Sequence, residues 1–282
     1  MSRHAVHIVL VLMLLAGAGC DNFVDPISDD RNGSVAMYGV LDMRTERQLL
    51  RLEALRSTIE EAPGGLQGVD VRSIEEATGS IQTWTRLDTT DRSGAPITLF
   101  EAYFEPAVGA TYRLEVYRGD VVLSFATTTV PPRPRLTVGP VAGDTSSLAQ
   151  TIFLENLEGV PERAHVDYAV VDTGQALPVI VPVTYGRLAA GLTEELQFQV
   201  NYGSDRYVVM AQLGKLVDEP GVRFRGLSLT FDVPSQEWAD PVANNVANDL
   251  GFLGAVGRYT YEWTVDGQTV EALGWVNEQS VE

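Results

Sequence analysis

Apolar and polar residues alternate along much of the chain, and this period of two predicts β-strands. The clearest case is residues 111–130, where Gly119 and Asp120 form a short turn between two alternating runs and so predict a β-hairpin. Similar runs predict further strands at residues 34–41, 81–87, 97–104, 165–171, 179–185, 196–202, 207–213, 223–233, 258–265 and 269–276. The pattern therefore predicts an all-β fold.

Helical signals are few and short. Residues 47–55 fit either a strand or a short helix. Residues 240–249 are the best helix candidate, because Asp240 can cap the first turn and Pro241 suits the first helical position. We therefore expect few short helices among the strands.

A proline-rich connector at residues 131–134 (PPRP) is expected to end the hairpin, because proline lacks the N–H donor that a sheet requires. We place a domain boundary there. The regular spacing of strands and turns predicts a β-sandwich over residues 34–130 and a second antiparallel sandwich or open barrel over residues 135–282. The sequence leaves open whether the connector separates two independent domains or bends one.

The first 19 residues are predicted to be an export signal. Residues 8–19 (IVLVLMLLAGAG) carry no charge, and they are too short to span a bilayer core of about 30 Å, which needs roughly 20 helical residues. The small residues before Cys20 resemble the lipobox of bacterial lipoproteins, although Gly17 stands where that motif prefers leucine. We expect Cys20 to be lipidated, with fatty acids such as palmitate, and residues 20–33 to form a tether.

Cysteine usage and charge support this interpretation. Cys20 is the only cysteine of the chain, so it has no intramolecular disulfide partner. The net charge of −18 repels nucleic acid and anionic lipid headgroups alike, so the lipid rather than a basic patch must hold the protein to the membrane. Lys215 is the only lysine, and such a composition is typical of proteins adapted to high salt. A surface for cations or for a basic partner is the alternative.

Candidate catalytic residues are scarce. His165 is the one histidine after the signal, and its place beside Asp167 in a predicted strand favours a half-exposed strand side chain over a general base. A single histidine and one lipidated cysteine argue against zinc, and residues 28–33 resemble a calcium loop only loosely. We therefore predict no catalytic residue, no metal and no cofactor. A pair of carboxylates acting on glycosides is the alternative that the acidic composition leaves open.

Four tryptophans are candidates for binding. Trp84 and Trp263 lie in alternating strands, where core packing is expected. Trp238 lies in a predicted loop at residues 234–240, and we expect it to contact a ligand or partner together with Asn244 and Asn245. Local packing is the alternative for Trp238.

Four short segments together resemble an uncharacterised family of surface lipoproteins, often encoded beside TonB-dependent outer-membrane receptors. They are residues 37–42 (MYGVLD), 111–116 (TYRLEV), 127–132 (TTTVPP) and 244–254 (NNVANDLGFLG). The resemblance implies an immunoglobulin-like sandwich over residues 34–130 and a β-barrel receptor or nutrient-capture complex as partner. It supplies no catalytic residues.

These observations favour a lipid-anchored, non-enzymatic binding or accessory protein of an outer-membrane transport or nutrient-capture system. A polysaccharide-active hydrolase and a purely structural envelope lipoprotein are the alternatives. Asp21 directly after Cys20 resembles an inner-membrane retention signal in some bacteria, whereas acidic residues after the cysteine resemble a surface-export signal in others. The family resemblance favours the outer membrane.

Overall fold

The computed structural model describes residues 35–55, 66–90, 94, 96–172, 177–189, 194–239, 245–247 and 250–277. The predicted export signal, Cys20, the tether and the calcium-like loop lie outside the described residues. Gly33–Glu282 forms one unit by its internal contacts.

Strands dominate the described residues, which confirms the predicted all-β fold with few short helices. The strands are β1 (Val35–Asp42), β2 (Arg47–Ala54), β3 (Asp70–Glu75), β4 (Ile81–Thr90), β5 (Pro96–Tyr103), β6 (Thr111–Arg118), β7 (Val121–Thr129), β8 (Arg135–Ala142), β9 (Ala149–Glu155), β10 (Glu162–Asp172), β11 (Val179–Gly186), β12 (Glu195–Asn201), β13 (Val222–Pro234), β14 (Val246–Ala247), β15 (Leu250–Trp263) and β16 (Val276–Asn277). The helices are α2 (Tyr202–Gln212), α3 (Gln236–Ala239) and α4 (Gly267–Ala272).

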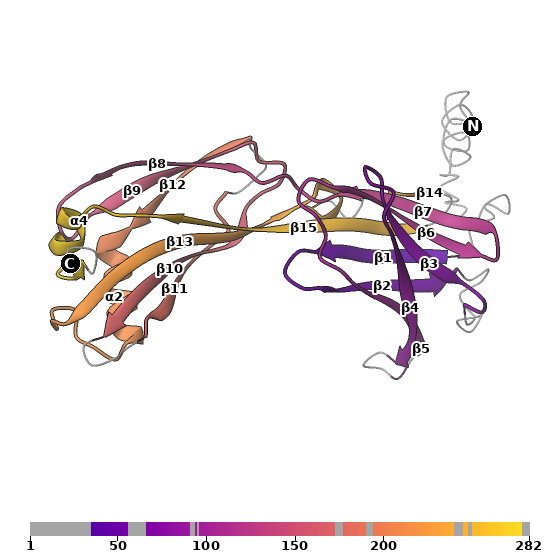
Figure 1. The fold of residues 1–282 in the computed structure, drawn as a ribbon, viewed down its shortest axis with the longest axis horizontal. Helices are drawn as coiled ribbons and strands as arrows, with labels where there is room; N and C mark the ends of the chain where they lie inside the picture. The colour runs from indigo at the N-terminus through magenta and orange to yellow at the C-terminus, as the bar shows by residue number, and fades with distance from the viewer. Residues whose placement is uncertain are drawn as a thin grey trace, which may run out of the picture. The chain divides into compact units, whose positions relative to one another are not determined.

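Hydrogen bonds join these strands into a large mixed sheet and a small one (Figure 1). The large sheet has the order β11-β10-β13-β15-β1-β2-β5-β4-β3-β6-β7-β14, with β16 added beside β13, and the small sheet has the order β12-β9-β8. The pairs β1–β15 and β13–β16 are parallel, whereas the other registered pairs are antiparallel. The first strand of the described chain is therefore bonded to one that lies near its end.

Two long strands change partners along their length. In β4, residues 81–84 pair with β3 and residues 85–90 pair with β5. In β15, residues 250–256 pair with β1 and residues 256–263 pair with β13 (Figure 1). Strands that switch partners in this way allow a sheet to turn a corner and enclose a core.

The buried apolar side chains of the described residues form two clusters. The first core includes Met37, Leu50, Val71, Trp84, Phe100, Leu114, Val130, Leu253 and Ala255. The second core includes Ile152, Val166, Tyr168, Tyr202, Met210, Phe231, Tyr259 and Trp275. Strand β15 supplies residues to both cores, and β14 supplies Val246 to the first, so two segments from the C-terminal half help to close the N-terminal core.

The proline connector lies between β7 and β8 and contains no strand, as expected. The hydroxyl of Tyr259 donates to the Pro131 carbonyl, and that of Tyr261 donates to the Pro134 carbonyl. Both ends of the connector are thus bonded to β15. The immunoglobulin-like description of the first part stays a prediction.

Several local predictions are confirmed. The hairpin is formed by β6 and β7, and Gly119 in its turn has a φ of 58°, a left-handed conformation that glycine adopts without strain. The segment at residues 47–55 forms a strand over residues 47–54 rather than a helix. Of the helix candidate at 240–249, only residues 245–247 are described, and β14 occupies 246–247.

Two predicted strands are wrong. Residues 207–213 belong almost entirely to helix α2, whose buried side chains Tyr202, Asp205, Val209 and Met210 follow helical spacing. Residues 269–272 belong to helix α4, which begins at Gly267 because the carboxylate of Asp266 caps its first turn by accepting from the Thr269 N–H at 2.9 Å. Only the short β16 follows it.

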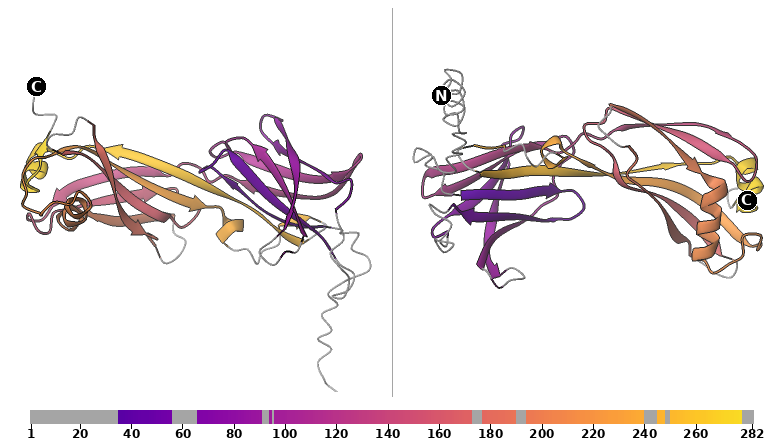
Figure 2. Two further views of the ribbon diagram at one scale, coloured as in Figure 1. Left: turned by 90° about the horizontal axis from the view of Figure 1, so that it is seen from below. Right: turned by 180° about the vertical axis from the view of Figure 1, so that it is seen from behind.

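A buried carboxylate fixes α2 to the sheet. Asp205 accepts hydrogen bonds of 2.6 Å from the hydroxyls of Tyr168 on β10 and Tyr185 on β11. Figure 2 shows α2, in orange, beside these strands. Burial raises the pKa of the Asp205 carboxyl above its usual value, although the two tyrosine hydrogen bonds act in the opposite direction.

This raised pKa predicts a characteristic pH dependence. The folded protein binds the Asp205 proton more readily than the unfolded chain, so ionisation of this group destabilises the fold above the folded pKa. As the pH falls through that pKa, the penalty is relieved. We therefore expect the free energy of unfolding of the wild type to rise relative to that of Asp205→Asn as the pH is lowered from 7 towards 3.8, the ordinary value for aspartate, measured by urea unfolding. A difference that is independent of pH would contradict the assignment.

Candidate functional site

Three aromatic side chains form a partly exposed cluster on the outer surface of the first core, and we call this cluster the aromatic strip. It consists of Tyr38 on β1, Phe252 on β15 and Trp238 on α3. The ring centroids of Tyr38 and Phe252 lie 6.0 Å apart, and those of Phe252 and Trp238 lie 5.7 Å apart. Tyr38 is 38% exposed and Trp238 is 39% exposed. The strip thus offers apolar surface to a partner.

The parallel pairing of β1 with β15 brings the first two rings together. Tyr38 and Phe252 are partners in the register of this pair. Side chains alternate between the two faces of a strand, and the adjacent Met37 and Leu253 are buried in the first core. Tyr38 and Phe252 therefore point to the opposite, outer face.

The third ring is positioned by α3, so the prediction of an irregular loop at Trp238 is wrong. Ser235, just before this helix, is bonded to Ala255 of β15 through both its backbone N–H (2.7 Å) and its hydroxyl group (3.0 Å). The helix then lies against β15 at Gly254, where an added Cβ would approach the Trp238 Cβ to 2.8 Å. A glycine at this position allows the tryptophan to reach Phe252.

Aliphatic side chains extend the apolar surface. Leu250 lies two residues before Phe252 on the same face of β15, and Leu49 on β2 is the register partner of Val40 on β1. Both leucines are exposed. Scattered exposed apolar residues are ordinary in soluble proteins, whereas a contiguous apolar surface marks an interaction site. Here the pairing of β1 with β15 and with β2 brings the aromatic strip and the two leucines onto one face of neighbouring strands.

The two predicted asparagines have different outcomes. Asn244 lies outside the described residues. The side-chain amide of Asn245 donates to the carbonyls of Leu253 (2.8 Å) and Thr127 (3.2 Å), and its oxygen accepts from the Leu253 N–H (2.9 Å). Asn245 therefore bonds β15 to β7, and the contact role that we predict for it stays untested.

Sequence reasoning found Trp238 but missed Tyr38 and Phe252. The latter two belong to runs of mostly apolar residues that are typical of buried strands, and no local signal shows which face of such a run is exposed. Residues 37–42 on β1 and residues 250–254 on β15, which the sequence analysis quoted in two separate segments, belong to one parallel strand pair.

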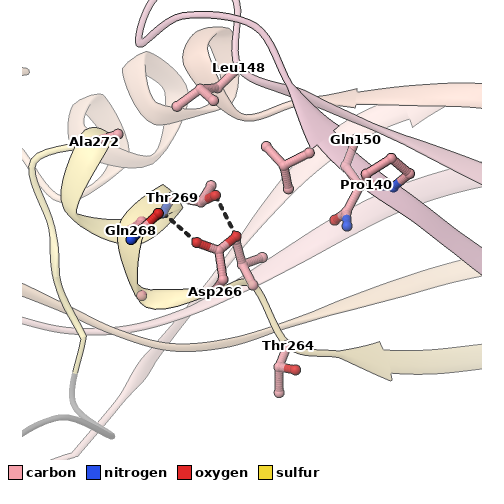
Figure 3. A pocket seen from close by; sticks show the side chains of 11 residues that line it. Pro140, Leu148, Gln150, Thr264, Asp266, Gln268, Thr269 and Ala272 are labelled. Carbon is pink, nitrogen blue, oxygen red and sulfur yellow. Dashed lines mark hydrogen bonds between the residues drawn. The ribbon is translucent and has the colours of Figure 1, made fainter.

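A second feature is a cavity of about 880 Å³ beside the second core. One wall comes from β8 and β9, and the other comes from the segment after β15 and from α4 (Figure 3). Its lining residues are Pro140, Val141, Leu148, Gln150, Thr264, Val265, Asp266, Gly267, Gln268, Thr269 and Ala272.

A third feature is a groove of about 440 Å³ on the outer face of β10, β13 and β15. Asp167 and Glu262 both line it, and each is a register partner of Ser228 on the strand between them. Their Cα atoms are therefore two strand spacings apart, or about 9.6 Å. Burial raises the pKa of Asp167, and this effect exceeds the opposing attraction of His165.

His165 lies on β10 with both ring nitrogens near other groups. Its Nδ1 lies 3.1 Å from the Arg163 carbonyl, and its Nε2 lies 3.5 Å from the Asp167 carboxylate. A general base needs one ring nitrogen directed at a nucleophile. This geometry suits a half-buried strand histidine.

Within the described ranges, no group of three or more His, Cys, Asp or Glu side chains is arranged to hold a metal ion. Nor does any helix in this part of the chain have the length and apolarity needed to cross a membrane. The sequence matches no known protein-family model and no curated protein.

Proposed function

We propose that this chain is a lipid-anchored, non-enzymatic binding or accessory protein of the bacterial envelope. Acylated Cys20 holds it to the outer membrane, and the aromatic strip contacts a protein partner. The partner class that we propose is a β-barrel receptor of a transport or nutrient-capture system.

The aromatic strip is the observation that carries this proposal. Exposed aromatic side chains are enriched in protein interfaces, because they bury large areas at a small cost in conformational entropy. The planes of Tyr38 and Phe252 meet at 72°, and those of Trp238 and Phe252 meet at 53°. Rings at such angles form a contoured surface rather than the flat platform on which a glycan chain would stack. The shape therefore favours an apolar protein surface as partner.

The resemblance supports the choice of partner class. The described residues of its four segments lie in β1, in the β6–β7 hairpin with its exit, and in and beside β14 and β15. In the structure β1 pairs with β15, and β14 pairs with β7. Segments that are far apart in sequence thus gather around the strip and the strands beside it.

Removal of the strip is expected to abolish partner capture. We expect the double variant Tyr38→Ser, Trp238→Ala to reduce recovery of a crosslinked partner from native envelopes by about tenfold or more, because loss of a central aromatic contact costs about 2 kcal/mol or more. The lipidated full-length protein is crosslinked in the envelope, purified and analysed by mass spectrometry, with quantitative recovery of the partner as the readout.

Tyr103→Ser is the matched control. Tyr103 is a 67% exposed aromatic residue on β5 that lies outside the strip, so its loss should leave recovery unchanged. Recovery of one β-barrel protein in near-equal amount by the wild type and by the control supports the proposal. Equal recovery of the partner by the double variant would show that the aromatic strip is not the contact surface. Recovery of the protein without any partner would favour a purely structural envelope role.

The groove favours a second candidate function, hydrolysis of a polysaccharide. Asp167 and Glu262 flank Ser228 on the same face of neighbouring strands and line one groove, and glycosidases act through a pair of carboxyl groups, one of them a general acid. The raised pKa of Asp167 suits a general acid. Release of reducing sugar from a glycan panel by protein starting at Asp21, and its loss in Glu262→Gln, tests this candidate. No release from the whole panel would exclude it for those substrates.

A further inference from the structure

We propose that the cavity between α4 and the β8–β9 hairpin binds a neutral, hydroxyl-rich ligand of the saccharide class. This site is separate from the aromatic strip, and the inference does not rest on the function proposed above. Its volume of about 880 Å³ falls within the range of roughly 300–1,000 Å³ that small-molecule sites occupy.

The two walls differ in polarity in a way that suits a sugar. Pro140, Val141 and Leu148 make the wall of β8 and β9 largely apolar. Thr264, Gln268 and other polar side chains line the facing wall (Figure 3). A sugar ring presents C–H groups on its faces and hydroxyl groups at its edge, so it can satisfy both walls at once.

A buried amide on the apolar wall is held in one orientation. Gln150 is only 6% exposed. Its Nε2 donates to the Gly139 carbonyl at 2.7 Å, and its Oε1 accepts from the Tyr202 hydroxyl and from the Trp263 Nε1–H, the latter at 3.0 Å. A polar group that is fixed before the ligand arrives loses little conformational entropy on binding.

Charge selects the class of ligand. Asp266 is the one formally charged side chain among the described residues that line the cavity. Its two carboxylate oxygens accept from the N–H (2.9 Å) and the hydroxyl (2.7 Å) of Thr269, and these hydrogen bonds lower its pKa, so it is ionised at neutral pH. Each oxygen keeps lone pairs that can accept from a ligand hydroxyl. An anionic ligand would meet this carboxylate with no cation in the lining to offset it.

The experiment is a glycan array probed with protein starting at Asp21, followed by titration calorimetry with the strongest binder. We expect binding of neutral glycans and none of sulfated or uronate-containing ones. The double variant Thr264→Val, Gln268→Ala removes two exposed polar side chains of the cavity wall and should weaken binding about tenfold, since each lost hydrogen bond costs about 0.5–1.5 kcal/mol.

A second variant and a control keep the test independent of stability. Ala272→Trp, at an exposed lining position on α4, should obstruct the cavity and abolish binding. Glu271→Ala changes the adjacent exposed residue, which does not line the cavity, and should bind like the wild type. Failure to bind any neutral glycan, preference for acidic glycans, or equal binding by the wild type and both cavity variants would each overturn the proposal. Capture of a protein partner through the aromatic strip should be the same in all these variants.

Discussion

Replacing Asp232 with asparagine is expected to lower the free energy of unfolding by about 2 kcal/mol, because its buried carboxylate loses charge-assisted hydrogen bonds to partly exposed arginines. The Asp232 side chain, on β13, is only 4% exposed. Its carboxylate accepts from Arg258 Nε at 2.9 Å and Arg44 Nη1 at 3.2 Å, and Arg163 Nη1 lies 3.9 Å away. The neutral amide would leave three guanidinium groups close together with one counter-charge fewer.

The loss should appear as a fall in the thermal midpoint of roughly 4–8 °C for a chain of this size. Glu53→Gln provides the comparison, because both side chains of the Arg51–Glu53 ion pair are exposed, Arg51 by 46% and Glu53 by 42%. Exposed pairs contribute at most about 1 kcal/mol. Similar midpoints for the two variants would show that the arginine cluster does not depend on Asp232.

Replacing Gly251 with alanine is expected to destabilise the fold by roughly 4 kcal/mol, combining backbone strain with steric overlap. Gly251 has a φ of 118°, a conformation that side chains disfavour, and an added Cβ would lie 1.8 Å from the Met37 carbonyl oxygen. That oxygen belongs to the backbone of β1, so it cannot move without disturbing the parallel pair β1–β15. Hydrogen exchange should show lost protection in both strands.

Gly226→Ala is the matched control for this substitution. Gly226 also lies in a strand, but an added Cβ would meet no atom within 4 Å, and its φ lies outside the left-handed region. Alanine at such a position is neutral or slightly stabilising, because it restricts the unfolded chain. If both variants unfold at the same denaturant concentration, the overlap between the added Cβ and the Met37 carbonyl oxygen does not destabilise the fold.

The sequence revealed those parts of the fold that depend on local chemistry. The β6–β7 hairpin follows from a two-residue turn and two alternating runs, and the proline connector follows from missing N–H donors. Helix α2 was mistaken for a strand because its run from Tyr207 to Leu213 is rich in valine and other apolar residues. Packing against β9 and β11 overrides that local preference.

The candidate site was harder to predict from the sequence, because its residues come together only through contacts distant in sequence. Trp238 stood out because it is a large aromatic residue in a polar stretch. Tyr38 and Phe252 join it only through the pairing of β1 with β15, and nothing in either strand identifies its partner. The cavity likewise combines β8 and β9, for which we predicted no strands, with helix α4, most of which we predicted to be a strand.

The pairing of β1 with β15 also sets the order in which the molecule can be completed. Residues 43–249 separate β1 from its parallel partner in β15, so β1 has no second neighbour until the ribosome has made all of them. A nascent chain that stops short of β15 would present an open strand edge, which is a site for aggregation. Because contacts so distant in sequence form slowly, we expect the first core to close late and to depend on chaperones until it does.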